Sequence, residues 1–275
     1  MIHGWPWARY LFIAAELTVL GALGWRLAGG DVPLMLLALV LVALLVAVAG
    51  GVFSLGAGLF ARPILAVTPA RAGDRVALTF DDGPDENETR AVAAQLEARG
   101  HRGTFFVIGK KAASQPALLA ELVVRGHGLG NHSFNHSWAT PFRHPAQLAA
   151  ELAQAQALLA QAGTRGRWFR PPVGLLSPRV AAAAQKSGLT IVGWSATARD
   201  GRASTTVEQA AARLIAAARP GAILVLHDAA ERGGRAPIAA RVLPALLDAL
   251  AARGLRSVTL DEILDGESSD ASPRS

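Results

Sequence analysis

From residue 76 onward, short apolar runs alternate with longer stretches rich in Ala and Leu. The runs predicted to form strands are residues 76–80, 104–108, 128–131, 168–170, 190–194, 222–226 and 256–259. The stretches predicted to form helices are residues 89–99, 116–125, 145–162, 178–187, 207–218 and 237–253. This alternation predicts parallel βα units, so the C-terminal ends of the strands should meet at one edge. Enzymes built in this way keep their reactive side chains at that edge.

Two polar motifs follow predicted strands: Thr-Phe-Asp-Asp-Gly-Pro at residues 79–84 and His-Ser-Phe-Asn-His at residues 132–136. One Asp together with His132 and His136 makes a facial ligand set for a divalent metal, with open coordination positions. The two His lie on one face if their loop turns helically. The other Asp is then a candidate base for a water molecule that the metal polarises. The first motif alone favours a plain turn, but the nearby pair of His favours a hydrolase metal site.

These motifs, followed in order by three others, resemble the polysaccharide deacetylase family, also called the NodB-homology domain or carbohydrate esterase family 4. The other three are Arg170-Pro171-Pro172-Val173-Gly174, a degraded fourth motif from Trp194 to Asp200, and Leu226-His227-Asp228. The resemblance covers roughly residues 74–264. It implies an α/β fold, a distorted (β/α)7 barrel of the NodB-homology type, and about seven strands can be counted in the sequence.

The resemblance implies that Asp82, His132 and His136 bind the metal and that Asp81 is the general base. Zn²⁺ is the default cation for two imidazoles and one carboxylate. The same ligand set also suits Co or Fe. The predicted cofactor is therefore a divalent metal, with zinc as the first choice.

The third motif supplies the next predicted roles. By the resemblance, Arg170 pairs with Asp81 and tunes its pKa. Pro172 and Val173 hold the chain so that a backbone N–H faces the developing oxyanion. The family usually has Tyr where this chain has Val173. The backbone donor survives that difference, whereas any contribution of a Tyr side chain is lost.

The last two motifs imply the leaving-group chemistry. His227 is the candidate general acid for the departing amine, because an imidazole can be protonated near neutral pH. Asp200 is predicted to orient His227 and to stabilise its charge. The family often has a further Asp and a Trp around this position, where this chain has Thr197 and Gly201, so a groove wall is missing. Asp228 is expected to brace the structure locally.

The predicted function is a metal-dependent hydrolase that removes the N-acetyl group from an amino sugar in a polysaccharide or glycan precursor. An alternative within this class is a deacetylase or deformylase of a polyprenyl-phosphate-linked amino sugar on the cytoplasmic face. An inactive glycan-binding module is disfavoured because Asp81, Asp82, His132, His136 and His227 are all present. A two-His-one-carboxylate iron oxygenase is disfavoured by the Asp-Asp-Gly-Pro turn and the separate His227.

The N-terminal part of the chain is strongly apolar. Residues 32–60 contain no charged residue, and residues 10–27 are apolar apart from Glu16, Thr18 and Arg26. Since a spanning helix needs about 20 apolar residues, we expect a transmembrane helical hairpin that precedes the barrel. A single anchor and a signal peptide are the alternatives. The predicted location is the plasma (inner) membrane of a bacterium, and the positive-inside rule applied to a hairpin places the domain in the cytoplasm.

Composition limits the remaining choices. The chain has no Cys, which excludes disulfides and thiolate metal sites. Its net charge is +6, which suits anionic lipid headgroups as a partner surface. The Arg residues are scattered without runs or interleaved aromatics, so we expect no nucleic-acid partner. The predicted divisions are a membrane anchor at 1–61, a linker at 62–73, the catalytic domain at 74–266 and a disordered tail at 267–275.

Overall fold

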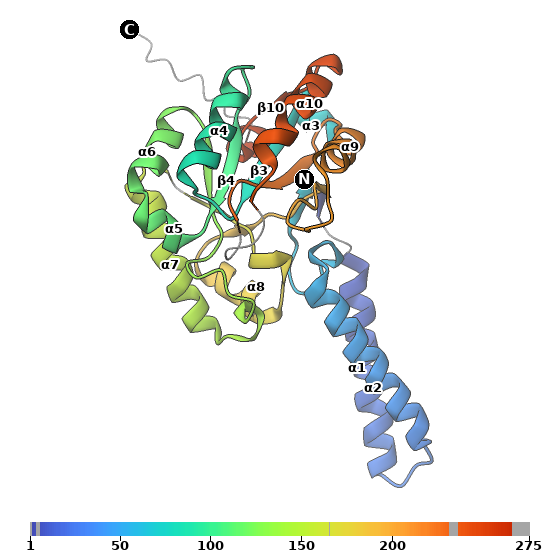
Figure 1. The fold of residues 1–275 in the computed structure, drawn as a ribbon. Coiled ribbons are helices and arrows are strands. Elements are labelled where there is room, and N and C mark those ends of the chain that lie inside the picture. The colour runs from blue at the N-terminus through green and yellow to red at the C-terminus, as the bar shows by residue number, and fades with distance from the viewer. Residues whose placement is uncertain (1, 4–5, 165, 231–235, 266–275) are drawn as a thin grey trace.

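The structure, a computed structural model, describes residues 2–3, 6–164, 166–230 and 236–265. It consists of an α/β domain from which two long helices project (Figure 1). The predicted tail at 267–275 lies outside the described residues.

The domain is built on a parallel sheet with the strand order β7-β6-β5-β4-β3-β9-β8. The strands are β3 (Arg75–Asp81), β4 (Gly103–Val107), β5 (Gly128–Asn131), β6 (Trp168–Phe169), β7 (Thr190–Ile191), β8 (Ala196–Thr197) and β9 (Ile223–His227). A further short strand, β10 (Arg256–Ser257), pairs with the start of β3. Every pairing along this path is parallel, as the alternating pattern predicts.

Residues 62–73, predicted as a linker, belong to the domain. They form β2 (Ile64–Ala66) and α3 (Pro69–Ala72), and β2 also pairs with β1 (Ile2–His3). Two isolated bridges join β2 to residues Val192 and Ala222, which adjoin β7 and β9. The predicted distorted barrel is found as a half-barrel, because among the described strands the path of pairings runs from β7 to β8 and these two end strands do not pair with each other.

Helices surround the sheet and bury its apolar side chains. They are α4 (Glu86–Glu97), α5 (Gly109–Ser114), α6 (Pro116–Val124), α7 (Pro145–Gln161), α8 (Pro178–Lys186), α9 (Val207–Ala217), α10 (Ala239–Ala252) and α11 (Leu260–Asp265). Local sequence sets several starts: the side chains of Asp85, Ser177 and Thr206 accept hydrogen bonds from backbone N–H groups in the first turns of α4, α8 and α9. The largest core cluster joins β3, β4 and β9 to α4, α9 and α10.

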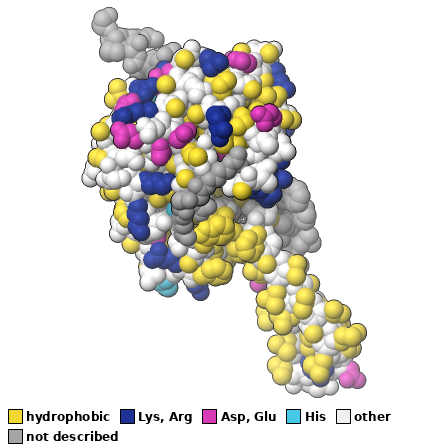
Figure 2. All heavy atoms as spheres, in the orientation of Figure 1, with side chains coloured by type: hydrophobic (Ala, Val, Ile, Leu, Met, Phe, Trp, Pro, Cys, Tyr) yellow, Lys and Arg dark blue, Asp and Glu magenta, His cyan; other side chains and the backbone are white. Residues whose placement is uncertain are grey.

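The two projecting helices are α1 (Pro6–Leu27) and α2 (Leu34–Phe53), which lie side by side (Figure 1). Hydrophobic side chains cover much of their surface (Figure 2). In α2 the most apolar window has a mean hydropathy of 2.9 and is only 6% buried. By length and composition α2 can cross a membrane, whereas α1 carries Glu16 and Arg26. A transmembrane hairpin thus stays a prediction, with α2 as its stronger half.

The C-terminal end of α2 is joined tightly to the domain. A short 3-10 helix, η1 (Leu55–Ala57), follows α2, and both Leu55 and Leu59 are buried. A side chain at Gly51 would lie 2.4 Å from the Leu59 side chain, so the helix and this segment approach closely. The N–H of Leu176 also donates a hydrogen bond of 3.0 Å to the carbonyl of Val52. The direction in which α2 leaves the domain is therefore set by packing.

Replacing Ile64 with Ala should lower the free energy of unfolding by about 2–4 kcal/mol, because the change leaves a cavity in a core site that is 2% exposed. Urea unfolding of the full chain in detergent measures this effect. Thr68→Ala is the matched control, since Thr68 is exposed and its side chain caps no N–H. It should change stability by less than about 0.5 kcal/mol. Equal effects of the two variants would show that β2 adds nothing to the domain.

Candidate active site

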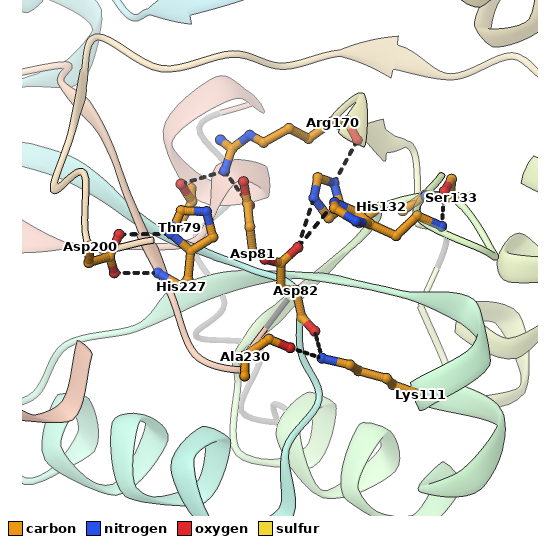
Figure 3. A network of polar contacts seen from close by, with 12 residues as sticks. Thr79, Asp81, Asp82, Lys111, His132, Ser133, Arg170, Asp200, His227 and Ala230 are labelled. Carbon is orange, nitrogen blue, oxygen red and sulfur yellow. Dashed lines mark hydrogen bonds and ion pairs between the residues drawn. The ribbon is translucent and has the colours of Figure 1, made fainter. Parts of the chain in front are cut away.

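The end of β3 places two carboxylates side by side. Asp81 is the last residue of β3 and pairs in register with His227, the last residue of β9. Asp82 follows with a φ of 73°, a left-handed value that a residue with a side chain rarely adopts. Because the backbone turns at this point, the two neighbouring carboxylates point in different directions (Figure 3). Both are 4% exposed.

Asp82 faces the two His of the second motif. Its Oδ1 lies 3.4 Å from Nε2 of His132 and 3.2 Å from Nε2 of His136. All three residues are buried, and one ligand atom from each lies within 4.8 Å of the others. Asp82 Oδ1 has no hydrogen-bond partner among the described residues. A buried carboxylate oxygen that has no hydrogen-bond partner and lies beside two imidazoles is well placed to bind a cation.

The spacing of these atoms fits a metal. Zinc ligands lie at about 2.0–2.1 Å, so two ligand atoms of a tetrahedral site are about 3.3 Å apart. The contacts of Asp82 with His132 and His136, at 3.4 and 3.2 Å, match that edge length. Burial by itself raises the pKa of Asp82. The contact and the charge of His132, followed by the charges of His227 and His136, have the larger effect and hold this pKa far below the usual range of an Asp. The carboxylate is therefore ionised, as a ligand must be.

His132 is fixed in the orientation and tautomer that a metal ligand needs. Its Nδ1 lies 2.7 Å from the carbonyl of Arg170, which can only accept a hydrogen bond. Nδ1 therefore carries a proton, which leaves Nε2 as the atom that faces Asp82 and would bind a metal. The same arrangement, with a backbone carbonyl behind the imidazole, is common around metal-binding His.

The loop that carries both His is not helical, so the helical condition for placing them on one face is not met, and the loop brings them together in another way. Ser133 and His136 have φ values of 62° and 49°. The Ser133 N–H donates to Asn131 Oδ1, and the His136 N–H donates to the hydroxyl of Ser133. These side-chain contacts hold a strained backbone in place. The described residues with a positive φ other than Gly are Asp82, Ser133, His136, Val173 and Arg199, and strain of this kind concentrates at functional sites.

Arg170 occupies the floor of the site. Its side chain is fully buried, and its Nη1 donates to Asp81 Oδ1 at 2.7 Å and to the hydroxyl of Thr79 at 2.9 Å. Burial lowers the pKa of the guanidinium, and the charge of Asp81 offsets part of that effect. The guanidinium also lies over the ring of Phe106, 4.1 Å from its centroid. The predicted pairing of Arg170 with Asp81 is thus present, and its carbonyl orients His132 as well.

His227 lies on the other side of Asp81 from His132, and Asp200 holds it there (Figure 3). Asp200 Oδ1 lies 2.7 Å from Nδ1 of His227, and Oδ2 accepts the backbone N–H of His227 at 2.8 Å. Burial lowers the pKa of His227, but the hydrogen bond and charge of Asp200, with the charges of Asp81 and Asp82, raise it to about 10. The imidazolium is therefore the stable form at neutral pH, and its Nε2 is the atom left to give a proton.

These groups meet in one pocket of about 190 Å³. It is lined by Asp81, Asp82, His132, His136, Val173, Gly174, Trp194, Thr197, Val225 and His227. The short helix η3 (Pro172–Gly174) brings Val173 to the pocket with a φ of 58°. The N–H groups of Gly174 and Leu175 close this turn on the carbonyls of Pro171 and Pro172. Among the described residues, no hydrogen bond uses the N–H of Val173.

Three residues near the pocket are not predicted from the sequence. Thr79 positions Arg170, and its place two residues before Asp81 on one strand puts both on the same face. Trp194 lies over Gly174, where a side chain would come within 2.6 Å of its ring. Lys111 donates to the carbonyl of Asp82 at 2.8 Å and so braces the turn (Figure 3). Thr79 and Trp194 open the first and fourth motifs, and the alternation of side chains along β3 also puts Thr79 on the face of Asp81, whereas Lys111 belongs to none of the five motifs.

Asp228 has a bracing position, as predicted, and does not line the pocket. Its Oδ2 accepts the hydroxyl of Thr89 at the start of α4. Burial raises the pKa of Asp228 to about 7, even though the hydrogen bond from Thr89 lowers it. A side chain at Gly83 would lie 2.6 Å from this carboxyl, so Asp228 also packs under the Asp-Asp-Gly-Pro turn.

Comparisons with known proteins agree with this geometry. The family profile described as Polysaccharide deacetylase matches residues 69–192, which include Asp81, His132 and Arg170 but end before Asp200 and His227. A chitooligosaccharide deacetylase from Azorhizobium caulinodans is 35% identical over 188 residues, covering 64% of this chain and 88% of that protein. A peptidoglycan-N-acetylglucosamine deacetylase from Listeria monocytogenes is 30% identical over 197 residues, covering 72% of this chain. This chain spans only 40% of the length of that relative.

Among solved structures, a family 4 acetyl xylan esterase from Clostridium thermocellum, in complex with a cobalt ion, has a TM-score of 0.62 and 35% sequence identity. The match covers 70% of this chain and 90% of that chain. Sequence, fold and the order of the motifs therefore agree, and this chain belongs to the polysaccharide deacetylase family.

Proposed function

We propose that this protein removes the N-acetyl group from an amino sugar of a glycan or glycan precursor, using a divalent metal, with zinc as the first choice. As a member of its family it is a hydrolase of N-acetyl amide bonds in carbohydrates. One observation carries the proposal. The ligand set of Asp82, His132 and His136 shares a pocket with a carboxylate held by Arg170 and an imidazolium held by Asp200.

Each of these residues has a separate role in amide hydrolysis. A metal held by Asp82, His132 and His136 would supply Lewis acidity to the acetyl carbonyl and to water. Asp81 takes the proton of the attacking water, and its pairing with Arg170 keeps it in place. The N–H of Val173 donates to the oxyanion. His227 then gives its proton to the sugar nitrogen as the carbon–nitrogen bond breaks, which leaves acetate and a free amine.

The full-length protein in detergent, given N-acetylchitotetraose, should release acetate. Treatment with a chelator followed by dialysis should abolish the release, and added Zn²⁺ or Co²⁺ should restore it. A mock-treated sample is the control. Undiminished activity in protein shown by elemental analysis to be free of metal would rule out the metal mechanism. The lack of acetate release from every N-acetylated glycan tested would rule out the proposed activity.

Metal content tests the ligand assignment directly. Alanine at Asp82, His132 or His136 should lower metal occupancy by roughly 10-fold or more, because each supplies one of only three protein ligands. Elemental analysis of the purified variants measures it. His144→Ala is the matched control, since His144 is exposed and caps α7 away from the pocket. Full occupancy in His136→Ala would refute the assignment.

The substrate that we propose is short or lipid-linked. Gly201 is exposed, and no described atom lies within 4 Å of the place where a side chain would begin, so this position supplies no side chain that could serve as the groove wall expected from the family resemblance. An apolar α2 and a net charge of +6 suit a protein anchored in the plasma membrane of a bacterium near anionic headgroups.

A topology reporter fused after residue 275 distinguishes between two substrates. A cytoplasmic signal favours a polyprenyl-linked amino sugar, and an outside signal favours a cell-wall polymer.

A further inference from the structure

Most of the large apolar side chains that the domain exposes belong to two segments that contribute residues to the pocket. Beyond α2, the large apolar side chains that are exposed in the described part of the chain are Val124 at 86%, Trp138 at 51%, Phe142 at 71% and Val173 at 40%. Val173 lines the pocket, and Trp138 and Phe142 belong to the loop that directly follows the pocket residue His136. Val124, at the end of α6, is the exception. We call Trp138, Phe142 and Val173 the apolar rim.

A hydrogen bond near Val173 places this part of the apolar rim close to the end of α2. Val173 is three residues from Leu176, whose N–H bonds to Val52 in the last turn of α2. Three residues of extended chain span at most about 10 Å. Val173 therefore lies close to the point where α2 leaves the domain.

The loop that carries Phe142 is held against the segment that follows Leu176. The hydroxyl of Ser177, next to Leu176, donates to the carbonyl of Pro141 at 2.8 Å. Arg179 also donates to the carbonyl of Phe142. These bonds fix the short helix η2 (Thr140–Phe142) against the start of α8. Figure 1 shows α8 beside the upper end of α2, and Figure 2 shows hydrophobic side chains grouped on the domain next to that junction.

The position of the apolar rim indicates what kind of surface it contacts. A bilayer that holds the uncharged α2 ends near Phe53, which is itself 71% exposed. Trp prefers the interface between headgroups and acyl chains, and Phe inserts just below it. An apolar surface that continues from a membrane helix is therefore matched to the membrane itself. Exposed Arg179 lies at the edge of this surface, where anionic headgroups favour a cation.

We propose that the apolar rim sits in the interface of the membrane that holds α2, so that the pocket opens onto the membrane surface and takes an amino sugar attached to a lipid. The substrate half of this proposal rests on the proposed deacetylase function. The membrane contact does not, because it follows from the location of the rim and of α2.

A labelling experiment tests the membrane contact without any activity. The chain has no Cys, so Phe142→Cys can be labelled at one position with an environment-sensitive nitrobenzoxadiazole group. The labelled full-length protein is reconstituted in phosphatidylethanolamine–phosphatidylglycerol vesicles with and without brominated acyl chains. We expect bromine to quench the label at residue 142 and to leave the matched Val124→Cys label unquenched. Equal quenching at the two positions overturns the proposal. The proposal is also overturned if, in detergent, the label at residue 142 becomes more shielded as the protein concentration rises, because a second copy of the chain then covers this residue.

A kinetic experiment tests the substrate. Phe142→Asp should lower kcat/KM for an N-acetylglucosaminyl lipid in vesicles by roughly 10-fold, because a charge opposes insertion of the rim. Its kcat/KM for soluble N-acetylchitotetraose should stay within about 2-fold of the unchanged protein, since Phe142 is outside the pocket and exposed. Val124→Asp should change neither value. A parallel loss on both substrates, or no loss on either, overturns the proposal. If the protein without substitutions is inactive on both substrates, the deacetylase function is refuted instead. The labelling result still decides the membrane contact.

Discussion

Replacing Asp81 with Asn should leave the metal bound and lower kcat by ~100-fold or more, because a positioned general base contributes a factor of this size. Asp81 lies beside the proposed ligand Asp82 but points toward Arg170, so the change removes the proposed base without removing a proposed ligand. The structure adds a second expectation. Arg170 is fully buried, and loss of its charged partner should cost about 3 kcal/mol of stability.

Acetate release, elemental analysis and thermal unfolding of Asp81→Asn measure the three quantities separately. Asp82→Asn is the matched variant, one residue away on the same turn, and it should lose metal. If Asp81→Asn lost the metal and Asp82→Asn kept it, the roles of the two carboxylates would be exchanged. If Asp81→Asn kept full activity, water would be activated by another group.

Replacing His227 with Ala should slow the hydrolysis of N-acetylated sugars ~100-fold or more but slow activated aryl acetates only a few fold. An amine leaves only when it is protonated, whereas an activated phenolate leaves without a proton, so a general acid matters only for the first. Asp200→Asn should show the same preference more weakly, because Asp200 acts through the imidazole that it holds at 2.7 Å. Equal losses on both substrate types would assign His227 a structural role.

The pH dependence of stability follows from the same pair. The folded pKa of His227 is about 10, above the unfolded value of about 6.5, so the His227–Asp200 pair stabilises the fold through the protonated imidazole. That stabilisation is complete below pH ~6.5 and is lost as the pH rises through the folded value. Urea unfolding of the metal-free protein should therefore show a larger loss of stability between neutral and alkaline pH than His227→Ala shows. A metal on Asp82 offsets part of the nearby negative charge and should move the loss to lower pH.

Several elements can be predicted because their signals are local. The run at 128–131 predicts β5 at its observed bounds, and the run at 76–80 predicts β3 with one residue missing at each end. Proline at the first turn marks the starts of α6, α7 and α8. The apolar pattern does not reveal β8, because Ala196–Thr197 is too short to show one. It indicates a linker in place of β2, because a three-residue strand between prolines has no visible partner in the sequence.

The sequence by itself determined the parallel α/β class and the order of the motifs, because periodicity and residue chemistry are local properties, and its resemblance to a family singles out Asp82, His132 and His136 as the proposed metal ligands. It did not determine how these side chains are held in place. The left-handed backbone at Asp82 and His136, the alignment of Asp81 with His227 across β3 and β9, and the apolar rim beside α2 appear only in the folded chain. Arg170 is the clearest case: its guanidinium holds Asp81, which is 89 residues away, and its carbonyl holds His132. Contacts between such distant residues depend on strand register and packing, which no local pattern encodes.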